Sequence, residues 1–189
     1  MGDWTREFDN SKAALQAFAD RVLADAKLNL KKKRKPGRTR SGLRAAPRKI
    51  NASGRLMRSL YWGWSDRKMT LGFGASGKAG KYAYYTEHGR GPGKQPPPRA
   101  IMQWIKIKPV RPRDLKTGKF IEKSQANLER MAFLIGRKIG RFGTEATNFY
   151  SRAFMKHYRK LDRDLQMKFA EDVEDHVDYS LKKLNIKIP

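Results

Sequence analysis

Three histidines and a few carboxylates are the side chains of this chain that are best suited to catalysis. His88, His157 and His176 lie far apart in the sequence, and no pair of them has a carboxylate partner at the spacing of a metal site. Glu87 and His88 could act as an acid and a base, but neighbouring residues of a strand point to opposite faces, and no third catalytic group is in view. We therefore predict a structural turn here and no metal site.

The other patterns that could indicate an enzyme are incomplete. Gly72 and Gly77 have the four-residue spacing of a phosphate-binding loop and Lys78 follows, but Ala79 stands where that motif has a metal-binding hydroxyl. Carboxylates two residues apart, such as Asp162 and Asp164, diverge on a helix and do not hold a catalytic metal. The chain has no cysteine, which excludes thiolate zinc sites and cysteine catalysis. We predict a protein that is not an enzyme and has no cofactor.

The charge of the chain favours an anionic partner. Its 189 residues include 43 Lys and Arg against 18 Asp and Glu, which gives a formal net charge of +25. Such a charge favours binding to nucleic acid or to an assembly that holds it, and the alternative is a basic surface that only keeps the protein soluble. No stretch approaches the roughly 18 apolar residues of a membrane span, and no signal peptide is visible. We expect no membrane partner.

The basic residues are concentrated in one segment. Between Asp25 and Asp66 there are thirteen Lys and Arg and no acidic residue. Because like charges repel each other, we predict an extended arm at residues 36–53 that contacts phosphate or an acidic neighbour. The alternative is a solvated loop. The residues assigned to this contact are Lys31, Lys32, Lys33, Arg34, Lys35, Arg38, Arg40, Arg44, Arg48 and Lys49.

The acidic residues are concentrated in the last predicted helix. Residues 162–178 include seven of them against two basic residues, a net charge of −5. Asp172, Asp175 and Asp178 are three residues apart and therefore share a side of the helix. We predict that they form an acidic assembly face that meets a basic neighbour in a head-to-tail contact. The alternative is the charged, solvent-facing side of an amphipathic helix.

Apolar periodicity predicts the elements of the first half of the chain. A helix is expected in residues 1–35, with Asp3 or Asp9 as its cap. An aromatic hairpin is expected at 60–74, where Trp62 and Trp64 share a face that packs in a core rather than stacking on nucleobases. Residues 75–81 are expected to form a loop, and 82–89 a turn.

Three further helices are predicted in the second half. One begins at Pro98, because proline is favoured at a helix start, and is followed by a basic loop at 108–120. A second covers 128–139, and the last covers 145–184, about 60 Å of helix whose apolar stripe needs a partner. The predicted regions of this single domain are an N-terminal helix at 1–35, a basic extended arm at 36–53, a β-sheet core at 54–98, a helical insert at 99–143, and a long C-terminal helix and tail at 144–189.

Four short motifs resemble those of tailed-phage head–tail joining and tail-completion proteins, in the same order. Residues 53–60 are similar to the family motif (Thr/Ser)-Gly-x-Leu-x-x-Ser-(Ile/Leu), and 82–89 to Tyr-Ala-x-x-x-Glu-x-Gly. Residues 97–105 resemble the Pro-Pro/Trp-Ile insert of a longer variant, and 149–153 the start of the final helix, although Thr147 and Asn148 stand where the family has proline. The residues that carry the resemblance are Gly54, Leu56, Ser59, Tyr82, Ala83, Glu87, Gly89, Pro97, Trp104, Phe149 and Ala153.

The resemblance implies an α+β fold, in which a small antiparallel sheet is packed by the N-terminal helix and the long C-terminal helix, with a helical insert and an extended basic arm. It also implies a homo-oligomeric ring in the neck of the virion, assembled in the host cytoplasm. Such a ring joins the portal or adaptor to the tail proteins around a passage for double-stranded DNA. The alternative that the charge favours is a basic RNA- or DNA-binding protein, of a ribosome-associated or packaging type, with a steep salt dependence.

Overall fold

The protein has an α+β fold that divides into two compact units. The computed structural model describes residues 8–34, 48–49, 53–68, 70–108, 110–114 and 117–184. The first, which we call the hairpin unit, comprises Met1–Asn29, Leu60–Ser76 and Phe149–Pro189, and the second, the insert unit, comprises Leu30–Ser59 and Gly77–Asn148. These units cut across the predicted sequence regions, because segments that are far apart in the chain pack together within the hairpin unit.

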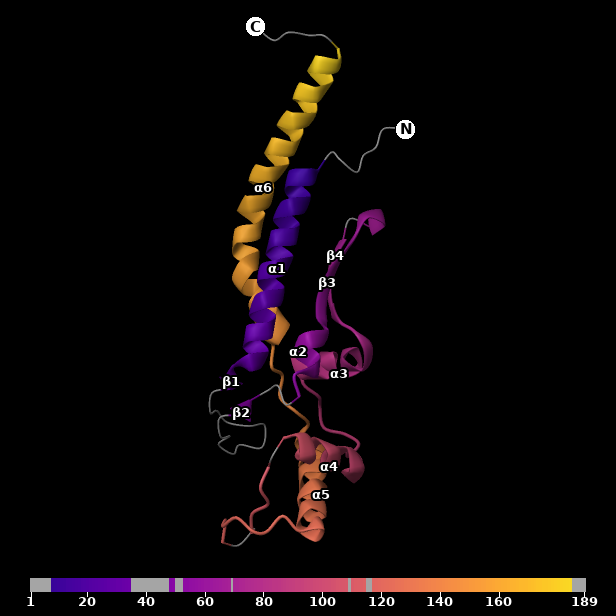
Figure 1. Ribbon diagram of the computed structural model, residues 1–189, viewed down its shortest axis with the longest axis vertical. Helices are drawn as coiled ribbons and strands as arrows, with labels where there is room; N and C mark the ends of the chain where they lie inside the picture. Colours follow the sequence, from indigo (N-terminus) through magenta and orange to yellow (C-terminus); the bar gives the residue numbers. More distant parts are fainter. Residues whose placement is uncertain are drawn as a thin grey trace. The chain divides into compact units, whose positions relative to one another are not determined.

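Two long helices dominate the hairpin unit, and Figure 1 shows them side by side. Helix α1 spans Asp9–Lys31 and helix α6 spans Phe149–Lys183. Phe18, Val22 and Ala26 of α1 are buried at helical spacing. The predicted helices therefore form, although the first one begins at Asp9 and the last one at Phe149, four residues later than expected.

The hairpin consists of β3 (Leu60–Ser65) and β4 (Thr70–Ala75), joined through a 3-10 turn at Asp66–Lys68. The strands are antiparallel and Trp62 pairs with Phe73. The ring of Phe73 lies 6.4 Å from that of Phe18 on α1 and 6.3 Å from that of Phe154 on α6. The indole nitrogen of Trp62 donates to the carboxylate of Asp20 at 2.7 Å. Both terminal helices thus pack on the sheet, as the resemblance implies.

The insert unit contains four helices among its described residues. They are α2 (Arg55–Ser59), α3 (Gly77–His88), α4 (Pro98–Ile107) and α5 (Gln125–Phe142). Ile101 and Ile105 of α4 pack on Ala132 of α5 to form a small core. Helix α4 begins at Pro98 as predicted, and α5 extends the predicted 128–139 helix at both ends, from its cap at Ser124 to Gly143.

Helix α3 corrects the sequence analysis, which expected a loop at 75–81 and a turn at 82–89. The chain is helical from Gly77 to His88. The side of the helix that is turned inward carries Ala79, Ala83 and Glu87 at intervals of four residues, and the first and last of these are buried. Because small residues and a carboxylate form this side, no apolar stripe reveals the helix. The predicted β-sheet core at 54–98 is therefore a hairpin flanked in sequence by helices.

The predicted basic arm lies mostly outside the described residues. Lys35, Arg38, Arg40 and Arg44 are all outside them. The described ends of the segment form two short strands, β1 (Lys33–Arg34) and β2 (Arg48–Lys49), which pair in antiparallel register. Residues 48–49 therefore lie beside residues 33–34.

Candidate functional site

The first motif of the resemblance forms a short structural turn of helix. Gly54 precedes α2 with a φ of +76°, a left-handed conformation that favours glycine. Leu56 is buried, and the hydroxyl of Ser59 donates to the carbonyl of Leu56 at 2.8 Å. Packing and local hydrogen bonding therefore account for all three residues.

The second motif fixes the end of α3 to the segment that precedes α6. Gly89 has a φ of +75°, and a Cβ at this position would lie 2.5 Å from the carbonyl oxygen of Thr144. The carbonyl of Glu87 accepts hydrogen bonds from the backbone of Thr147 at 3.1 Å and of Asn148 at 3.0 Å. Tyr82 is exposed, whereas Glu87 is buried. The motif thus holds a backbone junction, which explains its glycine.

The remaining motif residues do not gather around one site. Pro97 precedes the first residue of α4, and Trp104 lies on the surface of that helix with the ammonium of Lys108 5.4 Å from its ring centre. Phe149 and Ala153 are buried at the start of α6 in the hairpin unit. The motif residues therefore define packing positions in two separate units.

Asp172 does not belong to the predicted acidic assembly face. It is only 5% exposed. Its carboxylate accepts hydrogen bonds from the backbone of Asn10 at 2.9 Å, from the backbone of Ser11 at 2.8 Å, and from the hydroxyl of Ser11. Asp172 therefore caps the first turn of α1, where backbone N–H groups have no partner within the helix and negative charge is favoured.

The hydrogen bonds of Asp172 also set its ionisation. Burial alone would raise the pKa of this carboxyl, but the donors of Ser11 and Asn10 outweigh burial and hold its pKa below the ordinary value. Asp175 accepts a hydrogen bond from the side chain of Asn10 at 3.2 Å. Of the three predicted residues, Asp175 and Asp178 are exposed, and Asp178 lies six residues beyond Asp172. The physical reason for the error is the start of α1, which lies beside this part of α6.

Asp25 and His157 form a pair that sequence spacing did not reveal. The ring nitrogen Nε2 of His157 lies 2.9 Å from the carboxylate of Asp25, which also accepts a hydrogen bond from Lys156 at 2.7 Å. The hydrogen bond from Lys156 is the largest cause of a lowered pKa at Asp25, and His157 adds to it against the effect of burial. The residues are 132 positions apart, so only the packing of α1 against α6 brings them together. This cluster joins the two helices.

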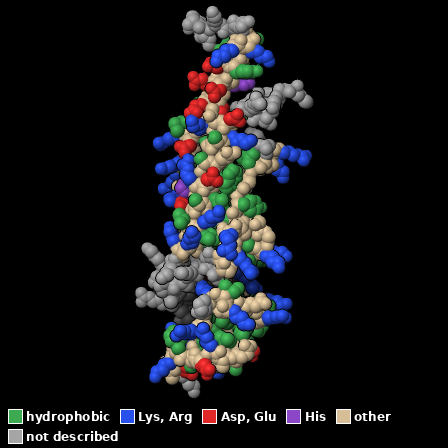
Figure 2. Space-filling model, in the orientation of Figure 1, with side chains coloured by type: hydrophobic (Ala, Val, Ile, Leu, Met, Phe, Trp, Pro, Cys, Tyr) green, Lys and Arg blue, Asp and Glu red, His purple; other side chains and the backbone are tan. Residues whose placement is uncertain are grey.

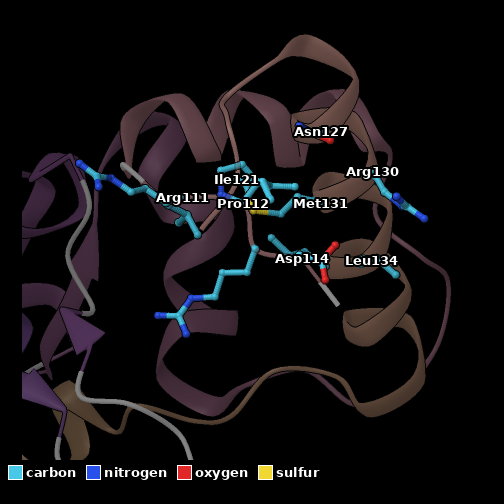
Figure 3. Close-up of a pocket in the computed structure, with 11 residues that line it drawn as sticks. Arg111, Pro112, Asp114, Ile121, Asn127, Arg130, Met131 and Leu134 are labelled. Carbon is cyan, nitrogen blue, oxygen red and sulfur yellow. The ribbon is translucent and has the colours of Figure 1, made fainter. Parts of the chain in front are cut away.

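A pocket of 690 Å³ lies in the insert unit, between residues 110–114 and Ile121 on one side and α5 on the other. Pro112, Ile121 and Met131 gather at its centre, while Arg111 and Arg130 extend away from it on opposite sides (Figure 3). The basic loop predicted at 108–120 contributes to this pocket, which no sequence pattern indicated. The lining residues are Val110, Arg111, Pro112, Arg113, Asp114, Ile121, Asn127, Arg130, Met131, Leu134 and Ile135.

Three arginines and one aspartate are the charged residues that line the pocket. The guanidinium of Arg113 lies 4.3 Å from the ring centre of Phe120, and that of Arg111 lies 6.0 Å from it. Asp114 is the acidic lining residue, and its carboxylate accepts hydrogen bonds from the backbone and the hydroxyl of Thr117 at 2.7 and 3.1 Å. The pocket therefore has an apolar centre, and Arg111 and Arg130 extend outward from it on opposite sides, so a ligand that suits it has an apolar part for the centre and anionic groups at its periphery.

Charge is unevenly distributed over the surface. Acidic side chains gather along the upper part of α6 in Figure 2, whereas Lys and Arg are spread over much of the remaining visible face. Within the described residues, no group of three or more His, Asp or Glu side chains is placed to hold a metal ion. None of the helices in the described ranges has the length and apolar character to cross a membrane.

Comparison with known proteins gives no family model that matches the chain, no similar curated protein and no similar solved structure.

Proposed function

We propose that this protein is a structural component of a tailed-phage virion, which forms a ring in the neck and joins the portal or adaptor to the tail around the DNA channel. The observation that carries the proposal is the ordered set of motifs that resemble head–tail joining proteins. Their glycines occupy positions that need glycine, at a φ of +76° for Gly54 and +75° for Gly89. Residues of this kind maintain a fold and are not a catalytic set.

The charge distribution supports assembly into a ring. The chain carries a net charge of +25, while residues 162–178 of α6 carry −5. Opposite charges on different parts of one chain favour head-to-tail contacts, and such contacts close into rings when the rotation between copies allows it. A ring that surrounds DNA must also let it slide, so we propose that many of the basic residues face protein neighbours and not phosphate.

Electron microscopy and native mass spectrometry of the purified protein test the proposal. We expect rings of one copy number, and particles assembled without the protein should accumulate as separate heads and tails. Complementation with the wild-type chain should restore joined particles. Joined, infectious particles in the absence of the protein would refute the neck function.

A second candidate, a basic nucleic-acid-binding protein, is favoured by the exposed aromatic side chains on α3. Tyr82, Tyr84 and Tyr85 are all exposed, and the ring of Tyr84 contacts that of His88 at a tilt of 48°, with ring centres 4.6 Å apart. Exposed rings beside basic residues can stack on nucleobases. This function predicts tight binding of single strands by a monomer, with loss of affinity in Tyr84→Ala. The neck function predicts weak binding of double-stranded DNA without sequence preference, and no effect of this substitution.

A further inference from the structure

The second half of α6 has an exposed edge that is both apolar and acidic. Val173 is 44% exposed, Val177 48% and Leu184 67%. At about 100° per residue, Val173 and Val177 lie about 40° apart around the helix, Glu174 lies about 60° from Val177 and Asp178 about 100° from it. Leu184 follows the last residue of α6. Asp172 points to a different side, toward the start of α1. We call these five residues, Val173, Glu174, Val177, Asp178 and Leu184, the acidic strip.

The pocket of the insert unit has the complementary chemistry. Its centre is apolar, and its lining residues include Arg111, Arg113 and Arg130. The acidic lining residue, Asp114, has its carboxylate engaged by Thr117. Its volume of 690 Å³ is that of a pocket which can enclose several apolar side chains.

We propose that the acidic strip of one copy of this chain docks in the arginine-lined pocket of the next copy. This inference rests on the proposed ring-forming function and identifies the contact that builds the ring. The apolar residues of the strip fill the centre of the pocket, while Glu174 and Asp178 meet the arginines that line it.

A second copy is the partner that fits both halves of this chemistry. A nucleic acid backbone would satisfy the arginines, but its phosphates have no apolar group to fill a centre formed by Pro112, Ile121 and Met131. Every copy carries one strip and one pocket on different units. Each contact therefore leaves one strip and one pocket free at the ends of a chain of copies, until the last copy meets the first.

Reversal of charge on each side of the contact tests the inference. The pocket variant carries Arg111→Glu, Arg113→Glu and Arg130→Glu, and the strip variant carries Glu174→Lys and Asp178→Lys. We expect each variant to raise the dissociation constant for self-association roughly tenfold or more, since reversed pairs repel. A protein with both sets of substitutions should regain most of the wild-type association, because the charges are again opposite.

Sedimentation velocity over a range of concentrations gives the dissociation constants, and circular dichroism reports folding. Matched controls reverse charge elsewhere: Lys94→Glu, Lys106→Glu and Lys138→Glu for the pocket, and Asp162→Lys for the strip. These should change association much less than the test variants. Val177→Ser provides a test that leaves the charge unchanged, and it should also weaken association.

Several results would overturn the inference. One is a dissociation constant equal to wild type in both the pocket variant and the strip variant. Another is a protein with both sets of substitutions that associates no better than either variant alone. A protein that remains a monomer at every concentration would also overturn it. Rings that persist unchanged in every variant would refute this contact but leave the neck function standing. If the charge variants behave as expected but particles without the protein are still joined and infectious, the contact stands and the neck function alone is refuted.

Discussion

The buried carboxylate of Asp172 makes the sharpest prediction about stability. Asp172→Ala removes the acceptor of the backbone N–H groups of Asn10 and Ser11 and of the hydroxyl of Ser11. Loss of a helix cap costs about 0.5–2 kcal/mol, and hydrogen bonds to a charged group contribute about 1.5–3 kcal/mol. Because these two figures describe the same contacts, we expect a loss of about 2–3 kcal/mol in the free energy of unfolding.

Urea denaturation followed by circular dichroism measures this loss. Chains of this size lose about 2–4 °C of Tm per kcal/mol, so thermal unfolding should shift downward by roughly 4–12 °C. Asp172→Asn keeps one acceptor oxygen and should lose less than Asp172→Ala. Asp178→Ala is the matched control on the same helix, since this residue is exposed and such substitutions usually change stability by less than about 0.5 kcal/mol. Equal stability of Asp172→Ala and Asp178→Ala would refute the capping role.

Three further predictions concern other contacts. The pKa of Asp172 is lowered in the folded state, so its contribution to stability is complete above the ordinary aspartate pKa and is lost as the pH falls through the folded pKa. When the free energy of unfolding is measured against pH, Asp172→Asn should therefore lose less stability in acid than wild type does. Gly89→Ala should destabilise the protein by more than about 1 kcal/mol in urea, because φ is +75° and the new Cβ meets Thr144; an unchanged midpoint would contradict this. The hydroxyl of Tyr150 donates to the carbonyls of Tyr61 and Gly74, so Tyr150→Phe should cost about 1 kcal/mol, with Tyr158→Phe as an exposed control.

Sequence periodicity predicted the elements that bury apolar residues at regular steps. The hairpin at 60–74, the helix that begins at Pro98 and the long last helix all form. Each has a strong local signal: aromatic strands, a proline at a helix start, or an apolar stripe. Helix α3 has none of these, since its buried residues are Ala79 and Glu87.

The errors at the candidate sites have a different cause. Asp172 and its partners are 161 and 162 residues apart, and Asp25 and His157 are 132 apart. Spacing within one segment cannot reveal such pairs, because they form only when α1 packs against α6. The pocket was missed for a related reason, as its lining combines residues 110–114 and Ile121 with one face of α5.

The capping of α1 by α6 has a consequence for the order of events during synthesis. The hairpin unit draws on Met1–Asn29, Leu60–Ser76 and Phe149–Pro189, whereas the insert unit is complete in sequence by Asn148. Domains generally fold as they leave the ribosome, and contacts between distant segments form late. The insert unit can therefore fold on the nascent chain, while the first turn of α1 waits for Asp172 to be translated. Until then α1 has neither its cap nor its partner helix, so translation itself delays the completion of the hairpin unit.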